Sequence, residues 1–196
     1  MQLETKRPTS PQISPAGSRI VFEVAHADLE SDRWVRRLHS TSLDAAKSDS
    51  PLSCEACWGA QWGGNDGTPY VLKLDDKGHE RVHSFDLSTG ALEPVTPEGD
   101  RVGWFQPSPD GTWIAYTVFE GDPGRWVLHA VRSTDGHVTT WGSANSAAEF
   151  SWSPASDRIV ATYQPNATLD WRRKALELLD PATGSRTPLD LSLIHI

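Results

Sequence analysis

Residues 105–116 read FQPSPDGTWIAY and combine a short apolar run, a tight turn and a second, alternating apolar run. Pro109 fixes φ near −65° at the second turn position, Asp110 can bond its own backbone, and Gly111 can adopt a positive φ. The β-branched and aromatic residues on both sides of the turn are typical of strands. The stretch therefore predicts a β-hairpin.

The same pattern recurs along the chain. SPAG at 14–17 precedes the apolar run RIVF, and SPAS at 153–156 precedes RIVA. A degenerate copy, GNDG at 64–67, precedes PYVL. These turns recur about every 45 residues, which is a typical blade or repeat period. A second turn, rich in Asp, Thr and Ser, recurs in phase with the first and closes on Gly90, Gly136 and Gly184.

Each repeat thus holds two hairpins, or four strands, which is the content of a β-propeller blade. One four-stranded sheet cannot bury both of its faces, whereas stacked blades cover one another. We predict an all-β fold over residues 8–190: a partial β-propeller of about four blades, each a four-stranded antiparallel sheet. The predicted blades span residues 8–52, 53–99, 100–146 and 147–190.

Nine tryptophans are many for a chain of 196 residues. Large aromatic rings stabilise mainly by burial, so we expect the rings in or beside strands to fill the space between blades. These are Trp58, Trp62, Trp104, Trp113, Trp126, Trp141 and Trp152.

Four blades are few for a closed propeller, so the sequence predicts an incomplete one. The last residues, 191–196, read LSLIHI and break the repeat. They resemble translated sequencing-adapter sequence, and we expect them to be a non-native tail that plays no part in the fold.

Composition narrows the class of function. The net charge of −8 disfavours nucleic-acid binding, which needs clustered Lys and Arg. No apolar run reaches the roughly 18 residues of a membrane helix, and the N-terminus lacks the apolar segment of a secretory signal. Two cysteines do not make a disulfide framework. We therefore expect a cytoplasmic protein in a reducing setting, with neither membrane nor nucleic acid as partner.

The turn-plus-strand repeats at 14–22, 108–116 and 153–161 resemble those of TolB-like propellers. They also resemble the N-terminal propeller of the prolyl oligopeptidase family of serine peptidases. Residues 11–22 are similar to the opening of the first blade in the acylaminoacyl-peptidase and dipeptidyl-peptidase-like members.

Two further stretches resemble these peptidases. Residues 27–38 are similar to their first-blade loop, and residues 74–97 to their second-blade hairpin. The strand after that first loop usually reads Leu-Trp in the family, whereas this chain has Leu38-His39. The resemblance covers about residues 8–190.

The resemblance implies a propeller that caps an active site and admits only short or unfolded peptides. In this family the catalytic Ser, Asp and His belong to an α/β-hydrolase domain with a Gly-x-Ser-x-Gly elbow. No such motif occurs in the sequence, nor does an alternation of strands and helices. We therefore predict no catalytic residue and no cofactor in this chain. A peptide substrate would bind at the hydrolase domain, which this chain lacks.

Two other classes of function stay open. One is a non-enzymatic TolB-like or WD-like propeller that serves as a protein-interaction scaffold. The other is a propeller with its own enzymatic site in a central channel, which would need polar residues converging near the axis.

Charged residues between the second and third strands of the first blade are the candidate substrate-binding site. Asp28, Glu30 and Asp32 could grip the free α-amino group of a peptide, with Arg33 orienting the carboxylates. The alternative is an ordinary solvated loop.

The other motifs favour structural roles. Cys54 and Cys57 form a lone CxxC without two further ligands at zinc spacing, and we expect two structural thiols near a blade junction. Asp75, Asp76 and Glu80 do not match a calcium loop and predict a charged hairpin tip. No metal site is predicted.

Two further motifs, a glycosylation acceptor and a basic cluster, predict no functional site. Asn166 matches a glycosylation acceptor but lacks a secretory context. The basic cluster at 171–174 is too short for nucleic-acid binding and predicts the start of an outer strand.

Overall fold

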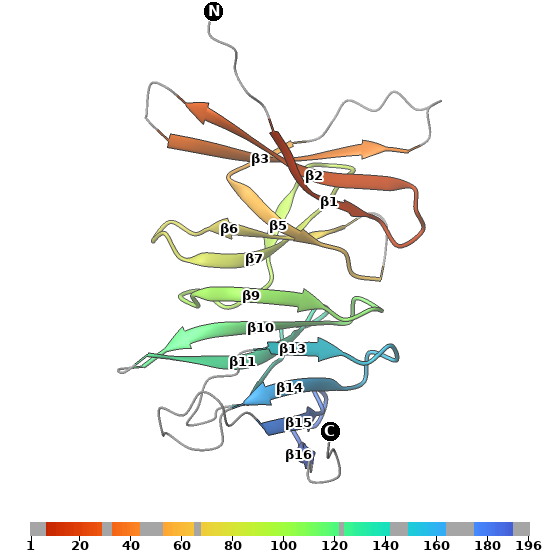
Figure 1. The fold of residues 1–196 in the computed structure, drawn as a ribbon, viewed down its shortest axis with the longest axis vertical. Helices are drawn as coiled ribbons and strands as arrows, with labels where there is room; N and C mark the ends of the chain where they lie inside the picture. Colours follow the sequence, from red (N-terminus) through yellow and green to blue (C-terminus); the bar gives the residue numbers. More distant parts are fainter. Residues whose placement is uncertain are drawn as a thin grey trace, which may run out of the picture. The chain divides into compact units, whose positions relative to one another are not determined.

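The computed structural model describes residues 7–28, 33–43, 53–64, 68–121, 124–141, 149–163 and 175–189. These ranges hold sixteen β-strands in four antiparallel sheets, each made of four consecutive strands (Figure 1). The predicted all-β architecture of four-stranded blades is confirmed. The chain divides into two compact units, Met1–Gly99 and Asp100–Ile196. Within the described ranges no helix could cross a membrane.

The first unit holds two sheets, whose strand orders are β1-β2-β3-β4 and β5-β6-β7-β8. Its strands are β1 (Arg7–Ile13), β2 (Arg19–Asp28), β3 (Arg33–Ser42), β4 (Ser53–Glu55), β5 (Cys57–Gln61), β6 (Tyr70–Leu74), β7 (Glu80–Phe85) and β8 (Leu92–Pro94).

The second unit has the same plan, with the orders β9-β10-β11-β12 and β13-β14-β15-β16. Its strands are β9 (Val102–Pro107), β10 (Trp113–Glu120), β11 (Arg125–Arg132), β12 (Val138–Trp141), β13 (Glu149–Trp152), β14 (Ile159–Tyr163), β15 (Ala175–Leu179) and β16 (Arg186–Leu189). The tail at 191–196, Asn166 and the basic cluster at 171–174 lie outside the described residues.

The serine of the repeated turn holds the first two strands of a sheet together. Ser108 is fully buried, and its hydroxyl accepts the N–H of Trp113 (3.0 Å), the first residue of β10. The same hydroxyl donates to Asp110 (2.6 Å). Ser14 and Ser153 accept the equivalent N–H groups of Arg19 and Arg158. The serine is therefore a turn cap.

The fourth residue of this turn needs a positive φ. Gly17 and Gly111 adopt φ of 70° and 74°, where a side chain would be strained. Ser156 occupies the same position in the last sheet with φ of 63°. Its hydroxyl accepts the backbone N–H of Asp110 (3.0 Å), so the residue that replaces glycine links two neighbouring turns.

The second repeated turn is capped by aspartate. The Oδ1 atom of Asp86 accepts the N–H groups of Ser88 and Thr89, and that of Asp180 accepts those of Ala182 and Thr183. Each turn connects the third and fourth strands of its sheet, which explains why the two turn motifs alternate along the chain.

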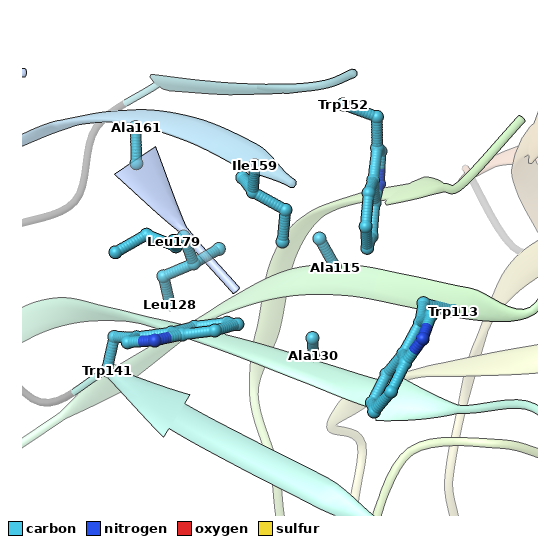
Figure 2. Packing of buried hydrophobic residues seen from close by; sticks show 9 residues of the cluster. All are labelled: Trp113, Ala115, Leu128, Ala130, Trp141, Trp152, Ile159, Ala161 and Leu179. Carbon is cyan, nitrogen blue, oxygen red and sulfur yellow. The ribbon is translucent and has the colours of Figure 1, made fainter. Parts of the chain in front are cut away.

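The two sheets of the second unit pack through tryptophan and small aliphatic side chains (Figure 2). The indole N–H of Trp152 donates to the carbonyl of Gln106 (2.9 Å), and that of Trp141 donates to Gly184 (3.2 Å). Each ring thus satisfies its polar atom on the opposite sheet. The cluster comprises Trp113, Ala115, Leu128, Ala130, Trp141, Trp152, Ile159, Ala161 and Leu179.

The sheets of the first unit pack in the same way but with fewer aromatic rings. A carboxylate is buried with them: Glu23 accepts the N–H of Gly59 in β5 (2.9 Å) and so ties β2 to the next sheet. The core consists of Val21, Leu38, Cys54, Cys57, Ala60, Val71, Phe85 and Leu87, with Trp62 and Leu92 packed against it.

The cysteines lie between the two sheets of the first unit, as predicted, because Cys54 belongs to β4 and Cys57 to β5. The prediction of two thiols is wrong, since the structure joins them in a disulfide with Cα atoms 5.6 Å apart. The backbone turns at Ala56, whose φ is 56°, and this bend brings both side chains into one core.

We expect Ser108→Ala to lower the free energy of unfolding by about 1–3 kcal/mol, because the buried N–H of Trp113 loses its side-chain acceptor. Urea unfolding measures the change. Ser151→Ala, at an exposed position in β13, is the matched control and should change stability by less than about 0.5 kcal/mol. Equal effects of the two substitutions would contradict the capping role.

Candidate functional site

The β2–β3 hairpin is longer than the sheet that carries it. Its ten residue pairs run from Arg19 and Ser42 to Asp28 and Arg33. The neighbouring strand β1 pairs with β2 only as far as Ala25, and β4 pairs with β3 only as far as Arg37. Within the described residues, which begin at Arg7, the last three pairs therefore extend about 10 Å beyond the paired parts of both neighbours. A hairpin arm of this kind can reach a ligand or another domain.

Two of the four predicted substrate-binding residues lie at the described end of this arm. The register places Asp28 directly opposite Arg33, at the ends of β2 and β3. Glu30 and Asp32 lie in the connection between these strands, outside the described residues. The structure thus brings together the backbones of two of the four residues, and the ligand-binding role stays a prediction.

The end of the β10–β11 hairpin carries exposed aromatic rings. Phe119 pairs with Trp126 beyond the last residues that β12 pairs with. Trp104 on β9 pairs with Thr117, two residues before Phe119, so the three rings share one face of the sheet. Trp104 is 54% exposed, Phe119 46% and Trp126 37%. We call these three residues the aromatic surface.

Two glycines allow the rings to lie against the backbone. A Cβ atom at Gly103 would stand 2.2 Å from the ring of Trp126, and one at Gly124 would stand 2.1 Å from the ring of Phe119. The two rings also contact each other, with centroids 5.2 Å apart. A larger residue at either position would displace the ring that lies against it, so the two glycines allow the close approach of the rings to the backbone.

The prediction that all seven tryptophans fill the space between blades is wrong for Trp104 and Trp126. Trp113, Trp141 and Trp152 are buried as expected. The two exposed rings lie near the end of the sheet, where Gly103 forms a bulge in β9. The glycine next to an in-strand aromatic residue was the available signal, because it marks close approach of a ring or ligand.

A buried polar row holds the base of this hairpin. The imidazole of His129 lies 3.2 Å from Glu120 through Nε2 and 2.9 Å from the hydroxyl of Thr140 through Nδ1. It also stacks on the fully buried ring of Tyr116, with centroids 5.2 Å apart. The row ties β10, β11 and β12 together on the face of the sheet opposite to the exposed rings.

Burial decides the charge of this row. It lowers the pKa of His129, while the charges of Asp100 and Glu120 act in the opposite direction. It also raises the pKa of Tyr116, with a further contribution from Asp100. At neutral pH the row therefore holds a neutral imidazole and a protonated phenol. These groups position the hairpin and offer no activated nucleophile.

The charged tip of the β6–β7 hairpin is structural, as predicted. Oδ1 of Asp75 accepts the N–H groups of Lys77 and His79, which closes the turn and lowers the pKa of Asp75. Within the ranges that the structure describes, no group of three or more His, Cys, Asp or Glu could hold a metal ion.

No protein-family model and no curated protein matches this chain. Solved structures are similar to it in fold. Pyrococcus horikoshii acylaminoacyl peptidase aligns over 95% of this chain and 33% of its own, with a TM-score of 0.73 at 11% identity. The β-propeller domain of the Trilobed protease from Pyrococcus furiosus, described as having an open velcro topology, aligns over 96% and 58%, with a TM-score of 0.70 at 10% identity.

TolB from Acinetobacter baumannii aligns over 94% of this chain and 43% of its own, with a TM-score of 0.58 at 19% identity. The fold is therefore similar to the β-propeller domains of acylaminoacyl peptidases and of TolB, at low sequence identity. The chain spans about a third of the acylaminoacyl peptidase chains that it matches.

The buried imidazole predicts a pH dependence of stability. Because the folded pKa of His129 is lowered, the unfolded chain binds a proton here at higher pH than the folded chain does. The free energy of unfolding should therefore fall as pH drops below about 6.5, until the folded pKa is passed. Urea unfolding between about pH 5 and pH 8 measures this slope.

His129→Gln should reduce the slope, and the exposed control His137→Gln should retain it. His83, whose pKa is also lowered by burial, accounts for part of the slope that remains. An unchanged slope in His129→Gln would show that this imidazole does not titrate differently on folding.

Proposed function

We propose that this chain is the substrate-gating propeller part of a serine peptidase that acts on short peptides, with its catalytic α/β-hydrolase domain outside these residues. The observation that carries the proposal is the fold similarity to acylaminoacyl peptidase over about 95% of this chain, at a TM-score of 0.73. The sequence motifs that resemble prolyl oligopeptidase propellers support it independently.

The β2–β3 arm is the proposed contact with substrate. In the sequence, Asp28 is the last residue of β2, Glu30 and Asp32 follow it closely, and Arg33 begins β3. A peptide's α-ammonium group pairs favourably with converging carboxylates, and Arg33 would limit the mutual repulsion of the acids. The arm would thereby select peptides with a free N-terminus.

The chemistry belongs to the proposed hydrolase domain. This sequence has no Gly-x-Ser-x-Gly elbow, so the chain by itself should cleave no peptide. The proposed setting is the cytoplasm, with peptide as the partner and no membrane or nucleic acid.

A second candidate is a non-enzymatic scaffold, which the similarity to TolB favours. The aromatic surface would then be a protein contact, since aromatic residues are enriched at interfaces. The two candidates differ in whether a hydrolase domain accompanies the propeller.

The test uses the full-length protein that contains this chain, with a peptide reporter offered as the free amine and as its N-acetylated form. In the triple variant Asp28→Asn, Glu30→Gln and Asp32→Asn, kcat/KM for the free amine should fall about 10-fold or more, mainly through KM. The N-acetylated reporter should be cleaved as before, because it has no ammonium group.

Asp76→Asn, at the exposed tip of the β6–β7 hairpin, is the matched control and should cleave both reporters like the wild type. Equal loss on both reporters would contradict the ammonium role. A full-length protein without peptidase activity would contradict the proposed function and favour the scaffold.

A further inference from the structure

The short outer strand of the first sheet is held to the core by a single side chain. β4 pairs with β3 over three residue pairs only. Ser53 and Glu55 are exposed, and Cys54 between them is the one buried side chain of this strand. The ion pair of Glu55 with Arg37 (3.1 Å) adds little, because solvent screens both exposed groups. The side-chain attachment of β4 to the core therefore depends on Cys54.

The disulfide connects this strand to the following sheet. Cys57 is the first residue of β5 and is fully buried, whereas Cys54 is 5% exposed. A disulfide between residues three positions apart closes a very small loop, so it restricts the unfolded chain little. Its main effect is local, because it fixes β4 against β5 at the bend of Ala56. The chain has no other cysteine, so no other thiol competes for this pairing.

The proposed cytoplasmic setting narrows the role of this bond. Disulfides of cytoplasmic proteins are usually transient, and they are either catalytic or redox-sensing. A catalytic CxxC pair needs a partly exposed thiolate, whereas both of these sulfur atoms are buried in the core between two sheets. Redox sensing is the role that remains.

We propose that the disulfide of Cys54 and Cys57 is a reversible redox latch, which holds β4 on its sheet when oxidised and releases the strand when reduced. Burial protects the bond while β4 is in place, so a reductant reaches it only when the strand opens locally. Short outer strands with few contacts open at the lowest cost, and β4 is such a strand.

The reductant is a small thiol or a dithiol. Its thiolate attacks the sulfur of Cys54, which is the less buried of the two. The disulfide bond breaks, and Cys57 leaves as a thiolate that takes up a proton. A second thiol then displaces the first from Cys54. The protein gains two electrons and two protons, and the two reductant thiols become one disulfide.

Reduction should release the strand without unfolding the sheets. A buried free thiol behaves as a small apolar side chain, so the core can keep both sulfur atoms. β4 then retains only its three pairs with β3 and the exposed ion pair.

The latch lies next to the base of the β2–β3 arm. The N–H of Ala56 donates to the carbonyl of Arg36 (3.2 Å), and the last three pairs of the arm begin at the adjacent Val35. Release of β4 would lengthen the part of β3 that lacks an outer neighbour. The redox state would thereby control the rigidity of the proposed substrate contact. This consequence rests on the proposed function, whereas the latch does not.

The test is amide hydrogen exchange of the 196-residue chain, followed by NMR in buffers of reduced and of oxidised glutathione. Two amides are matched reporters. Ala56 directly follows β4 and donates to Arg36, and Val95 directly follows β8 and donates to Val82 (2.9 Å). Both strands are outermost and three residues long, but only β4 carries a cysteine. Alkylation and mass spectrometry count the free thiols in each buffer.

In reduced glutathione both cysteines should be free, and the Ala56 amide should exchange at least about tenfold faster than in oxidised glutathione. Val95 should exchange equally in both buffers. The double variant Cys54→Ala and Cys57→Ala should show the fast Ala56 exchange in both buffers, and circular dichroism checks its fold.

A bond that survives reduced glutathione would identify a static disulfide, and thiols that stay free in oxidised glutathione would show that no latch forms. Either result overturns the proposal. Equal exchange of Ala56 in both buffers would also overturn it, as would a change at Val95 as large as that at Ala56. None of these measurements uses peptide cleavage, so failure of the proposed function is distinguishable from failure of the latch.

Discussion

The structure depends on one constraint: a four-stranded sheet has two apolar faces and cannot bury either one by itself. In the second unit the constraint is met by Trp141 and Trp152, each of which fills the space between sheets and donates its indole N–H to the other sheet. In the first unit, aliphatic residues fill the space between the sheets, and the buried carboxylate of Glu23 bonds to the neighbouring sheet. The repeated turns serve this packing by keeping each sheet in register.

The same constraint limits which positions of the chain can vary. Side chains along the middle of the strands pack against the neighbouring sheet. The amino-acid sequence can therefore vary freely only at the ends of the hairpins. The β2–β3 arm and the aromatic surface both lie there. The arm carries charged residues, and the aromatic surface consists of Trp104, Phe119 and Trp126.

Much of the fold could be predicted from the sequence because its turns are chemically explicit. Ser108 and Asp110 specify the hairpin that they cap. The exposure of Trp126 could not be predicted, because it depends on the ring resting on Gly103, two strands away. The disulfide was missed because it needs the bend at Ala56. At the candidate site, the spacing of the charged residues in the sequence predicted that Asp28, Glu30, Asp32 and Arg33 form a cluster. It did not predict that Asp28 pairs with Arg33 across β2 and β3.

Hydrogen exchange of the tryptophan indole N–H groups, followed by NMR, tests the central claim most directly. If sheet-to-sheet packing organises the chain, the indole protons of Trp141 and Trp152 should be strongly protected, because both are hydrogen-bonded to the opposite sheet. The indole protons of the exposed Trp104 and Trp126 should exchange rapidly. Exchange of Trp141 and Trp152 as fast as that of Trp104 would contradict the account.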